Sequence, residues 1–369
     1  MINKKIKLFA TAVTVACVVF TQTSCSIVGR LKEPISKFKT ATNLVTDSAR
    51  SSYTILNEYS MDAALRRAQC KEINPNTSCI PTPTNRDEII KSRIISDAGM
   101  KARLAALKSL DEYVNLLSSI VESDKPKEVG ESAEKLKTSI DSLASQIAKL
   151  TKEPATTTGS AGTSATNAND AKFTSVVGLF STAMAQILTA VAERKRSGAL
   201  KKAILDGKTP VDQLLIAIRD DFGIFWAKEV MSASDEIRFA FIALTADICQ
   251  TRNMNPDAPV LENCRPRQPN DPPYERPNDA ELKRIREGVV AAIQARDDLD
   301  KSNPTTAVEA MQKAHTAMHT WADKPTSDNF VASMQAIESY VTAATRLGVA
   351  IVAIHEANKK KDEETETSE

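Results

Sequence analysis

The stretch Val129-Gly-Glu-Ser-Ala-Glu-Lys-Leu-Lys-Thr-Ser-Ile-Asp-Ser-Leu-Ala-Ser-Gln-Ile-Ala-Lys-Leu150 decides the fold of this chain. Its apolar residues recur at alternating steps of four and three, which is the spacing of a heptad seam along one face of a helix. The same spacing recurs from Phe173 to Val191 and from Phe330 to Ile351. No stretch alternates with period two over the length of a strand, and glycine (11 residues) and aromatic residues (5%) are scarce. The sequence therefore predicts an all-α protein.

About eight long helices, packed antiparallel in a bundle, are expected from this periodicity and from the positions of proline. The expected ranges are 35–70, 86–123, 127–152, 170–205, 210–250, 279–301, 304–322 and 327–358. Pro210 after Thr209 and Pro304 after Asn303 are interpreted as first-turn prolines that follow N-cap residues.

Two segments have compositions that are unsuited to packing. The Ser/Thr/Ala/Gly-rich tract 153–169 predicts a flexible connection, and the charged end 359–369 predicts disorder. This divides the chain into an N-terminal helical region over 35–152 and a C-terminal helical region over 170–358. The tract between them is either a domain boundary or a long hairpin loop.

The first 24 residues have the layout of an export signal. A lysine-rich start precedes an apolar run over 8–20, and small residues lead up to Cys25. This segment resembles the lipobox of bacterial lipoproteins, although Gln22 stands where that family prefers leucine. The resemblance implies cleavage of residues 1–24, acylation of Cys25, and a lipidated tether over 25–34 that attaches the protein to a membrane.

Ser26 bears on the destination of the protein. The family's inner-membrane retention signal places aspartate after the lipidated cysteine, so serine implies the periplasmic face of the outer membrane. Two alternatives stay open, namely Cys17 as the acceptor, and a secreted protein or uncleaved anchor without lipid. The formal net charge of +1 gives no basic surplus, so a nucleic-acid partner is not expected.

Four further cysteines are expected to form two disulfides, because an oxidising envelope compartment favours pairing of an even number. Of the three connectivities, we take the sequence-local one, Cys70 with Cys79 and Cys249 with Cys264, as the simplest. Each bridge would close a short loop and stabilise the fold by ~3 kcal/mol. Zinc is the competing interpretation, but the cysteines are spaced more widely than in zinc knuckles.

The second cysteine loop is the candidate recognition surface. If the helices run up and down from the anchored N-terminus, the loops that follow 35–70 and 210–250 lie at the end distant from the membrane. The second of these loops is rich in proline and presents Arg265, Arg267 and Tyr274, residue types that contribute strongly to protein interfaces. We expect a protein partner in the envelope to bind there. The alternative is that prolines and disulfides only restrain the connections, and a homo-oligomer also stays open.

His315 and His319 are the candidates for a metal site, since they stand four residues apart on an expected helix. The glutamate of a zincin motif is absent between them, and His355 lies too far along the next helix to be a third ligand. We therefore expect His315 at the edge of the core, His319 in solvent, and no cofactor. Serine-hydrolase and P-loop motifs are missing from the sequence, so no catalysis is predicted.

Three functions follow from these expectations, in order of preference. The first is a membrane-anchored periplasmic lipoprotein that acts as a helical binding or scaffold module. The second is a membrane-active helical protein, because the stretch from Phe173 to Ala192 carries no charge and resembles the membrane-entering elements of α-helical pore-forming toxins. The third is a metal-dependent enzyme built on the two histidines.

Overall fold

The computed structural model describes residues 27–73, 94–123, 125–151, 163–192, 196–253 and 279–366. Every regular element within these ranges is an α-helix, so the all-α prediction is confirmed. The helices are α2 (Ile27–Ile73), α4 (Asp97–Glu122), α5 (Pro126–Leu150), α6 (Thr163–Ala192), α7 (Arg196–Asn253), α8 (Asp279–Ser302), α9 (Thr305–Asp323) and α10 (Ser327–Glu366).

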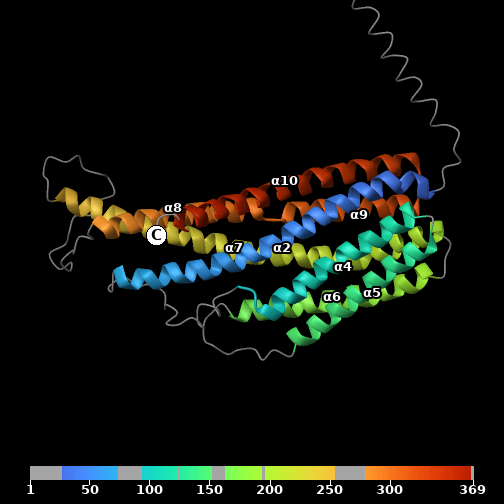
Figure 1. Ribbon diagram of the computed structural model, residues 1–369, viewed down its shortest axis with the longest axis horizontal. Helices are drawn as coiled ribbons and strands as arrows, with labels where there is room; N and C mark the ends of the chain where they lie inside the picture. The colour runs from blue at the N-terminus through green and yellow to red at the C-terminus, as the bar shows by residue number, and fades with distance from the viewer. Residues whose placement is uncertain are drawn as a thin grey trace, which may run out of the picture.

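The helices form an elongated bundle in which successive helices reverse direction from α2 to α7 (Figure 1). α8 and α9 differ, because they run one after the other in the same direction. Both pack against α7 and α10. Only Asn303 and Pro304 separate them. α8 and α9 therefore occupy one position in the bundle and are interrupted at Pro304, where the sequence had predicted the start of a separate antiparallel helix.

Side chains at the helix starts explain several boundaries. The Oγ of Ser96 accepts a hydrogen bond from the Gly99 N–H at 3.0 Å and caps α4. Pro126 occupies the first turn of α5, where its missing N–H costs nothing. The Oδ1 of Asn303 accepts from the Thr305 N–H at 3.0 Å, but Pro304 itself is the N-cap residue of α9, so the predicted first-turn proline precedes the first turn by one residue.

The predicted boundary at Pro210 is wrong. α7 begins at Arg196 and runs unbroken through Pro210, whereas α6 ends at Ala192. Pro210 has no N–H to donate to the carbonyl of Asp206, so the helix loses one internal hydrogen bond. Pro210 and Val211 are both buried. Their packing against the bundle offsets a cost of about 3 kcal/mol for an internal proline.

Other helix boundaries also differ from the predicted ones. α2 begins before its expected start and includes Pro34, and α4 begins at Asp97, later than expected. α6 begins at Thr163, inside the stretch predicted to be flexible. α10 continues to Glu366, into the stretch predicted to be disordered, where lysine and glutamate are good helix formers. Except at the start of α4, composition indicated less helix than the chain forms.

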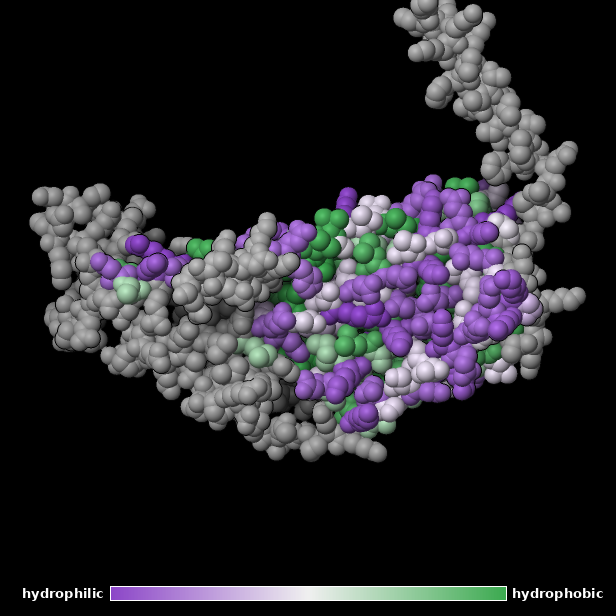
Figure 2. Space-filling model, in the orientation of Figure 1, coloured by the Kyte–Doolittle hydropathy of each residue, from purple (hydrophilic) through white to green (hydrophobic). Residues whose placement is uncertain are grey.

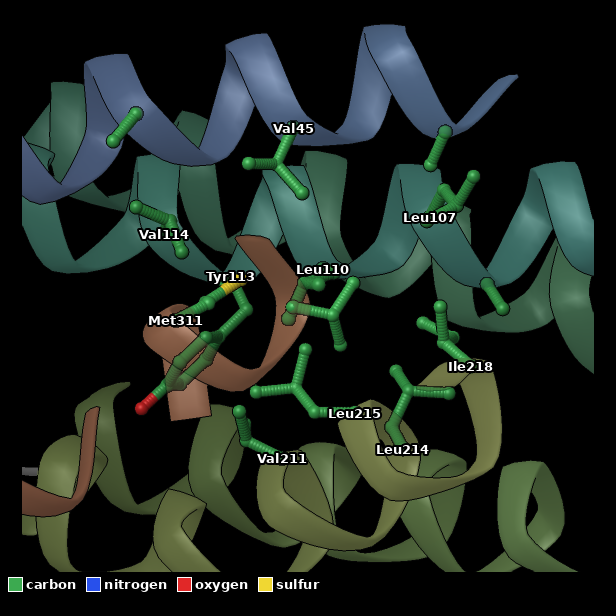
Figure 3. Packing of buried hydrophobic residues seen from close by; sticks show 14 of the residues in the cluster. Val45, Leu107, Leu110, Tyr113, Val114, Val211, Leu214, Leu215, Ile218 and Met311 are labelled. Carbon is green, nitrogen blue, oxygen red and sulfur yellow. The ribbon is translucent and has the colours of Figure 1, made fainter. Parts of the chain in front are cut away.

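One hydrophobic cluster joins residues from all the helices named above. Figure 3 shows its centre, where Val45 of α2, Leu110 of α4, Leu215 of α7 and Met311 of α9 point toward one another. Each of these side chains is at most 2% exposed. Helices that precede and follow the tract 153–169 therefore share one core.

The heptad seams face this core, as the sequence predicts. In α6 all six seam residues, from Phe173 to Val191, are buried. In α5, Leu136, Ile140, Leu143 and Leu150 are buried while the other seam residues are partly buried. In α10 the buried seam residues are Ile337, Ala344 and Ile351.

Candidate functional site

The interior of the bundle holds an ion pair between α4 and α7. Arg103 donates through Nε and Nη2 to the two carboxylate oxygens of Asp221, at 2.5 and 2.7 Å. The hydroxyl of Tyr53, on α2, donates to the same carboxylate at 2.9 Å. The guanidinium also lies 5.0 Å from the ring centroid of Phe173 and 5.1 Å from that of Phe225. Residues of α2, α4, α6 and α7 therefore meet at one pair of charges.

This pair is inaccessible to a ligand, since the side chains of Arg103 and Asp221 are 0% and 3% exposed. Burial, together with the negative charge of Asp221, raises the pKa of Tyr53, so its hydroxyl remains a donor. Breaking one partner would leave an uncompensated charge in the core. We conclude that the Arg103–Asp221 pair positions helices and does not bind a substrate.

A second polar cluster surrounds His315, which lies inside the core and not at its edge. Its Nε2 is 3.1 Å from the hydroxyl oxygen of Tyr113, and that oxygen is 3.2 Å from the carbonyl oxygen of Ala203. Its Nδ1 faces Oδ1 of Asp212 at 3.8 Å, and both of these atoms are buried without a hydrogen-bond partner. Lys208 forms an ion pair with the other carboxylate oxygen of Asp212.

His319 lies one turn beyond His315 and is half-buried, so it does not stand in open solvent as expected. Burial and the positive charge of Lys208 lower its pKa. The nitrogens of His315 are directed toward Tyr113 and Asp212, which leaves neither for a metal ion shared with His319. Within the described ranges, no group of three or more His, Cys, Asp or Glu side chains is placed to hold a metal ion.

The surface between α2, α4 and α5 carries an open polar groove with a volume of about 710 Å³. Figure 2 shows that this face of the bundle is mainly hydrophilic. The groove is lined by Asn43, Asp47, Arg50, Lys101, Leu104, Ala105, Lys108, Asp111, Glu112, Asn115, Ser142 and Gln146. Such a mixture of amide, hydroxyl and charged groups suits a polar partner better than an apolar ligand.

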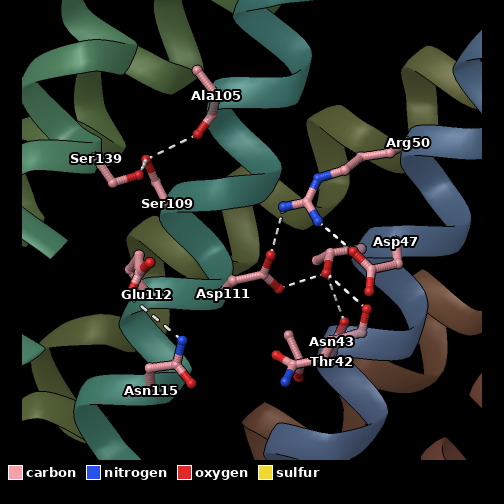
Figure 4. Close-up of polar contacts among 11 residues, drawn as sticks. Thr42, Asn43, Asp47, Arg50, Ala105, Ser109, Asp111, Glu112, Asn115 and Ser139 are labelled. Atoms are coloured by element: carbon pink, nitrogen blue, oxygen red, sulfur yellow. Dashed lines mark hydrogen bonds and ion pairs between the residues drawn. The ribbon is translucent and has the colours of Figure 1, made fainter. Parts of the chain in front are cut away.

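The acids of the groove are already engaged within the protein (Figure 4). Arg50 donates to Asp47 at 2.5 Å and to Asp111 at 2.6 Å, and the hydroxyl of Thr46 donates to the second oxygen of Asp111. The amide of Asn115 donates to Glu112. These contacts give each acid a hydrogen-bond donor, although the single charge of Arg50 faces two carboxylates.

Two lysines of the groove differ from the acids, because neither has an ion-pair or hydrogen-bond partner among the described residues. Lys101 and Lys108 are exposed and lie two turns apart on α4, about 10 Å along the axis. Between them the floor is formed by Leu104 and Ala105. The three acids and three bases that line the groove balance in charge, and the two lysines are its bases that can pair with an acidic group of a partner.

Asp111 is the less exposed of the two acids that bind Arg50, with a side chain 15% exposed against 70% for Asp47. Burial raises its pKa to about 6, although the Thr46 hydroxyl and the Arg50 charge oppose that rise. Its protonation would remove half of the ion pair that joins α2 to α4. The groove is thus sensitive to mild acid.

Most site residues predicted from the sequence lie outside the described residues. These are Cys25, Cys79, Cys264, Arg265, Arg267 and Tyr274. Cys70 and Cys249 lie near the C-terminal ends of α2 and α7, in helical backbone whose side chains are not described. Those two helix ends lie at the same end of the bundle, opposite the start of α2 (Figure 1). The lipidation, the disulfides and the recognition loop stay predictions.

Two stretches of the described helices are long and apolar enough to cross a membrane, judged by length and composition. They are Ala171–Thr189 in α6 and Ser327–Glu356 in α10, with mean hydropathies of 1.3 and 1.4. Of these stretches, 28% and 39% respectively are buried inside the bundle. Because core helices of soluble proteins have the same composition, this is weak evidence for membrane association.

No protein-family model, curated protein or solved structure matches this chain.

Sequence reasoning missed the groove and both buried polar clusters. A signal for Arg103 does exist, because it shares the apolar face of α4 with Ala106, Leu107 and Leu110. A charged residue on such a face requires a buried partner. The identity of that partner, Asp221, cannot be read from local spacing, since the two residues are 118 positions apart.

Proposed function

We propose that this protein is a helical binding or scaffold module, attached through acylated Cys25 to the periplasmic face of the outer membrane. The observation that best supports binding is the polar groove between α2, α4 and α5, with its unpaired Lys101 and Lys108. The length of the helices supports a spacer role, because the 47 residues of α2 extend about 70 Å at ~1.5 Å per residue.

In this proposal the protein has two contact regions. Disulfides Cys70–Cys79 and Cys249–Cys264 would close loops at the end of the bundle opposite the anchor, where Arg265, Arg267 and Tyr274 would face a partner. The groove would offer a second contact on the side of the bundle. No catalytic step is part of this proposal, and self-association through either region remains compatible with it.

The anchor and the disulfides are tested together by intact mass of the protein extracted from membranes of its host, with and without reduction. We expect the mass of residues 25–369 plus a diacylglyceryl and an N-acyl group, with four cysteines blocked until reduction. An unacylated mass would overturn the anchored location. Free thiols would overturn the disulfide-closed loops.

Binding in the groove is tested by site-specific photo-cross-linking in the host. A photoreactive residue in place of Ser142, on the groove rim, should yield one discrete adduct that is lost when Lys101 and Lys108 are both changed to glutamate. The matched control places the same residue at Lys137, which is on the opposite face of α5. Equal adducts at both positions, or an adduct that survives the charge reversal, would contradict a groove-specific acidic partner.

The second candidate function is insertion of the stretch from Phe173 to Ala192 into a bilayer. Its support is the composition of α6 and the hydroxyl groups of Ser181, Thr182 and Thr189, each of which donates to the carbonyl four residues before it. Such internal bonds reduce the cost of placing hydroxyls in lipid. Leakage from lipid vesicles at protein concentrations that leave the bundle folded would support insertion, and intact vesicles would exclude it.

A further inference from the structure

The outer face of α10 carries large apolar side chains that remain exposed. α10 lies along one edge of the bundle (Figure 1), and Figure 2 shows apolar side chains along that edge. Val331, Val349 and Val352 are 53%, 66% and 56% exposed. Apolar side chains that recur along one exposed helix face indicate a surface that binds a partner.

This face also carries few charges. Between Asp328 and Glu356, the only residues of α10 that are Asp, Glu, Lys or Arg are Glu338 and Arg346. An exposed helix of a soluble protein usually has a charged outer face. The outer face of α10 is therefore easier to remove from water than an ordinary helix surface.

The hydroxyl groups of the face do not oppose its burial. Ser339, Thr342 and Thr345 each donate to the carbonyl four residues earlier in the same helix, at 2.9, 3.0 and 2.8 Å. Their protons thus keep a hydrogen-bond acceptor when water is removed.

The two charges stand symmetrically about Thr342, four positions before it and four positions after it. At 3.6 residues per turn, each points within about 40° of the direction of Thr342. Arg346 is exposed and has no ion-pair or hydrogen-bond partner among the described residues. Glu338 is exposed too, and its one ion-pair partner in the described chain, Lys37, lies at 3.8 Å and is held closer by Glu33, at 2.8 Å. Because Glu338 and Arg346 are about 12 Å apart along the axis, they do not pair within one helix.

We propose that the outer face of α10 binds the same face of a second copy of this chain, with the two helices antiparallel about a two-fold axis at Thr342. In such a pair, a residue a given number of positions before Thr342 faces the residue the same number of positions after it in the other copy. Glu338 of each copy then faces Arg346 of the other, which gives two equivalent ion pairs. The other facing pairs are Val331 with Ala353, Ala332 with Val352, and Gln335 with Val349.

A bilayer is the other candidate to cover this face, because Ser327–Glu356 is long and apolar enough to cross one. In a helix that crosses a bilayer, Glu338 and Arg346 would both lie in the hydrocarbon region, where charged side chains are costly. The antiparallel pair instead gives each of them a counter-charge. Charge complementarity therefore favours a second copy over lipid.

The size of the contact indicates a reversible pair. The stretch 331–353 is about 33 Å long, and on a helix about 10 Å wide it buries on the order of 300–400 Å² per copy. A standard stable interface buries about 800 Å² per partner. Beyond this stretch Asp328 would face Glu356, and the repulsion between these like charges limits the contact to the stretch.

Antiparallel pairing points the two N-termini in opposite directions. Two copies anchored in one membrane could therefore pair only while lying along it, and not while standing upright on it. The pair is thus a second state beside the upright spacer proposed above. Its test depends on neither the anchor nor the groove.

Cysteine cross-linking of the full-length chain in its host tests the pair directly. A cysteine introduced by Thr342→Cys lies on the two-fold axis and should give a disulfide-linked dimer above the level of wild type. The control is Val331→Cys, because the two copies of that position are about 33 Å apart in the antiparallel pair and should give no added dimer. Both positions are exposed, so the bundle should stay folded. Equal dimer at both positions would indicate parallel packing and overturn the proposal, as would no dimer at Thr342→Cys, the result expected if lipid or another protein covers the face.

Charge reversal tests the ion pairs. In the Thr342→Cys chain, either Glu338→Arg or Arg346→Glu alone places like charges opposite each other, so the dimer yield should fall roughly tenfold. The two reversals together restore opposite charges and should restore the yield. Because these residues do not pair within one chain, a folding defect caused by one reversal would not be repaired by the other. A double variant as weak as the single variants would refute the pairing.

Discussion

The Arg103–Asp221 pair allows a quantitative test of how the bundle is held together. Arg103→Met leaves the Asp221 carboxylate buried without its counter-charge. Asp221→Asn likewise leaves the Arg103 guanidinium buried without a counter-charge. The pair is joined by two short hydrogen bonds, and its side chains are 0% and 3% exposed. Each single variant should therefore lower the free energy of unfolding by ~3–5 kcal/mol.

The double variant, which combines Arg103→Met with Asp221→Asn, tests whether the two costs are independent. If the two costs were independent, they would add to roughly 6–10 kcal/mol, which approaches the whole stability of a typical protein. Because the double variant has no unpaired charge, we expect it to cost no more than the larger of the two single changes. The coupling between Arg103 and Asp221 should therefore amount to at least ~3 kcal/mol.

The assay is urea unfolding followed by far-ultraviolet circular dichroism, which is strong in an all-α protein. The control is the same cycle at Glu134 and Lys137 on α5, a pair 3.7 Å apart whose side chains are 71% and 59% exposed. We expect no measurable coupling there. Additive costs at Arg103 and Asp221 would refute the view that the two charges act as one unit in the core.

Three further outcomes are expected. Gly207→Ala would place a methyl group 2.4 Å from the Tyr113 hydroxyl and should destabilise the fold by ~1–3 kcal/mol. Gly178→Ala, with nothing within 4 Å of the added methyl group, should stabilise the fold by up to ~1 kcal/mol. Thermal unfolding of the two variants compares these effects. Burial raises the pKa of Asp111 to about 6 from its ordinary value of 3.8, so the folded state holds this proton more tightly than the unfolded chain. The resulting stability is complete below about pH 4 and lost as the pH rises through about 6, and urea titrations should show wild type losing up to ~3 kcal/mol relative to Asp111→Asn over that window. Val177→Asp puts a charge at a fully buried position of α6 and should cost more than ~3 kcal/mol; a variant of wild-type stability that no longer inserts into vesicles would favour the membrane-active alternative.

The helix faces were predictable from the sequence because burial imposes a period on each helix by itself. The seam from Phe173 to Val191 required no knowledge of partners, and every residue of it is buried. The continuation of α7 through Pro210 was not predictable in the same way. A proline lowers local helix stability, but the burial of Pro210 and Val211 against neighbouring helices decides the outcome.

The polar contacts depend on tertiary structure even more strongly. The spacing of His315 and His319 suggested that they face a common ligand, yet His315 points to Tyr113, which is 202 positions away. The groove likewise combines residues of α2, α4 and α5. Local periodicity identifies the exposed face of each helix, but not which exposed faces lie side by side.

The position of α2 affects when the fold can form. Although it comes first among the described helices, α2 packs against α4, α7, α8, α9 and α10. Its Ser52 hydroxyl donates to the carbonyl of Ser302, and Tyr340 donates to Thr42 across 298 positions of the chain. During synthesis, the apolar face of α2 therefore stays exposed to solvent until α10 has been made, and exposed apolar surface favours aggregation. Loss of α10 by premature termination would leave that surface permanently open, and such a truncated chain should depend on chaperones or be degraded.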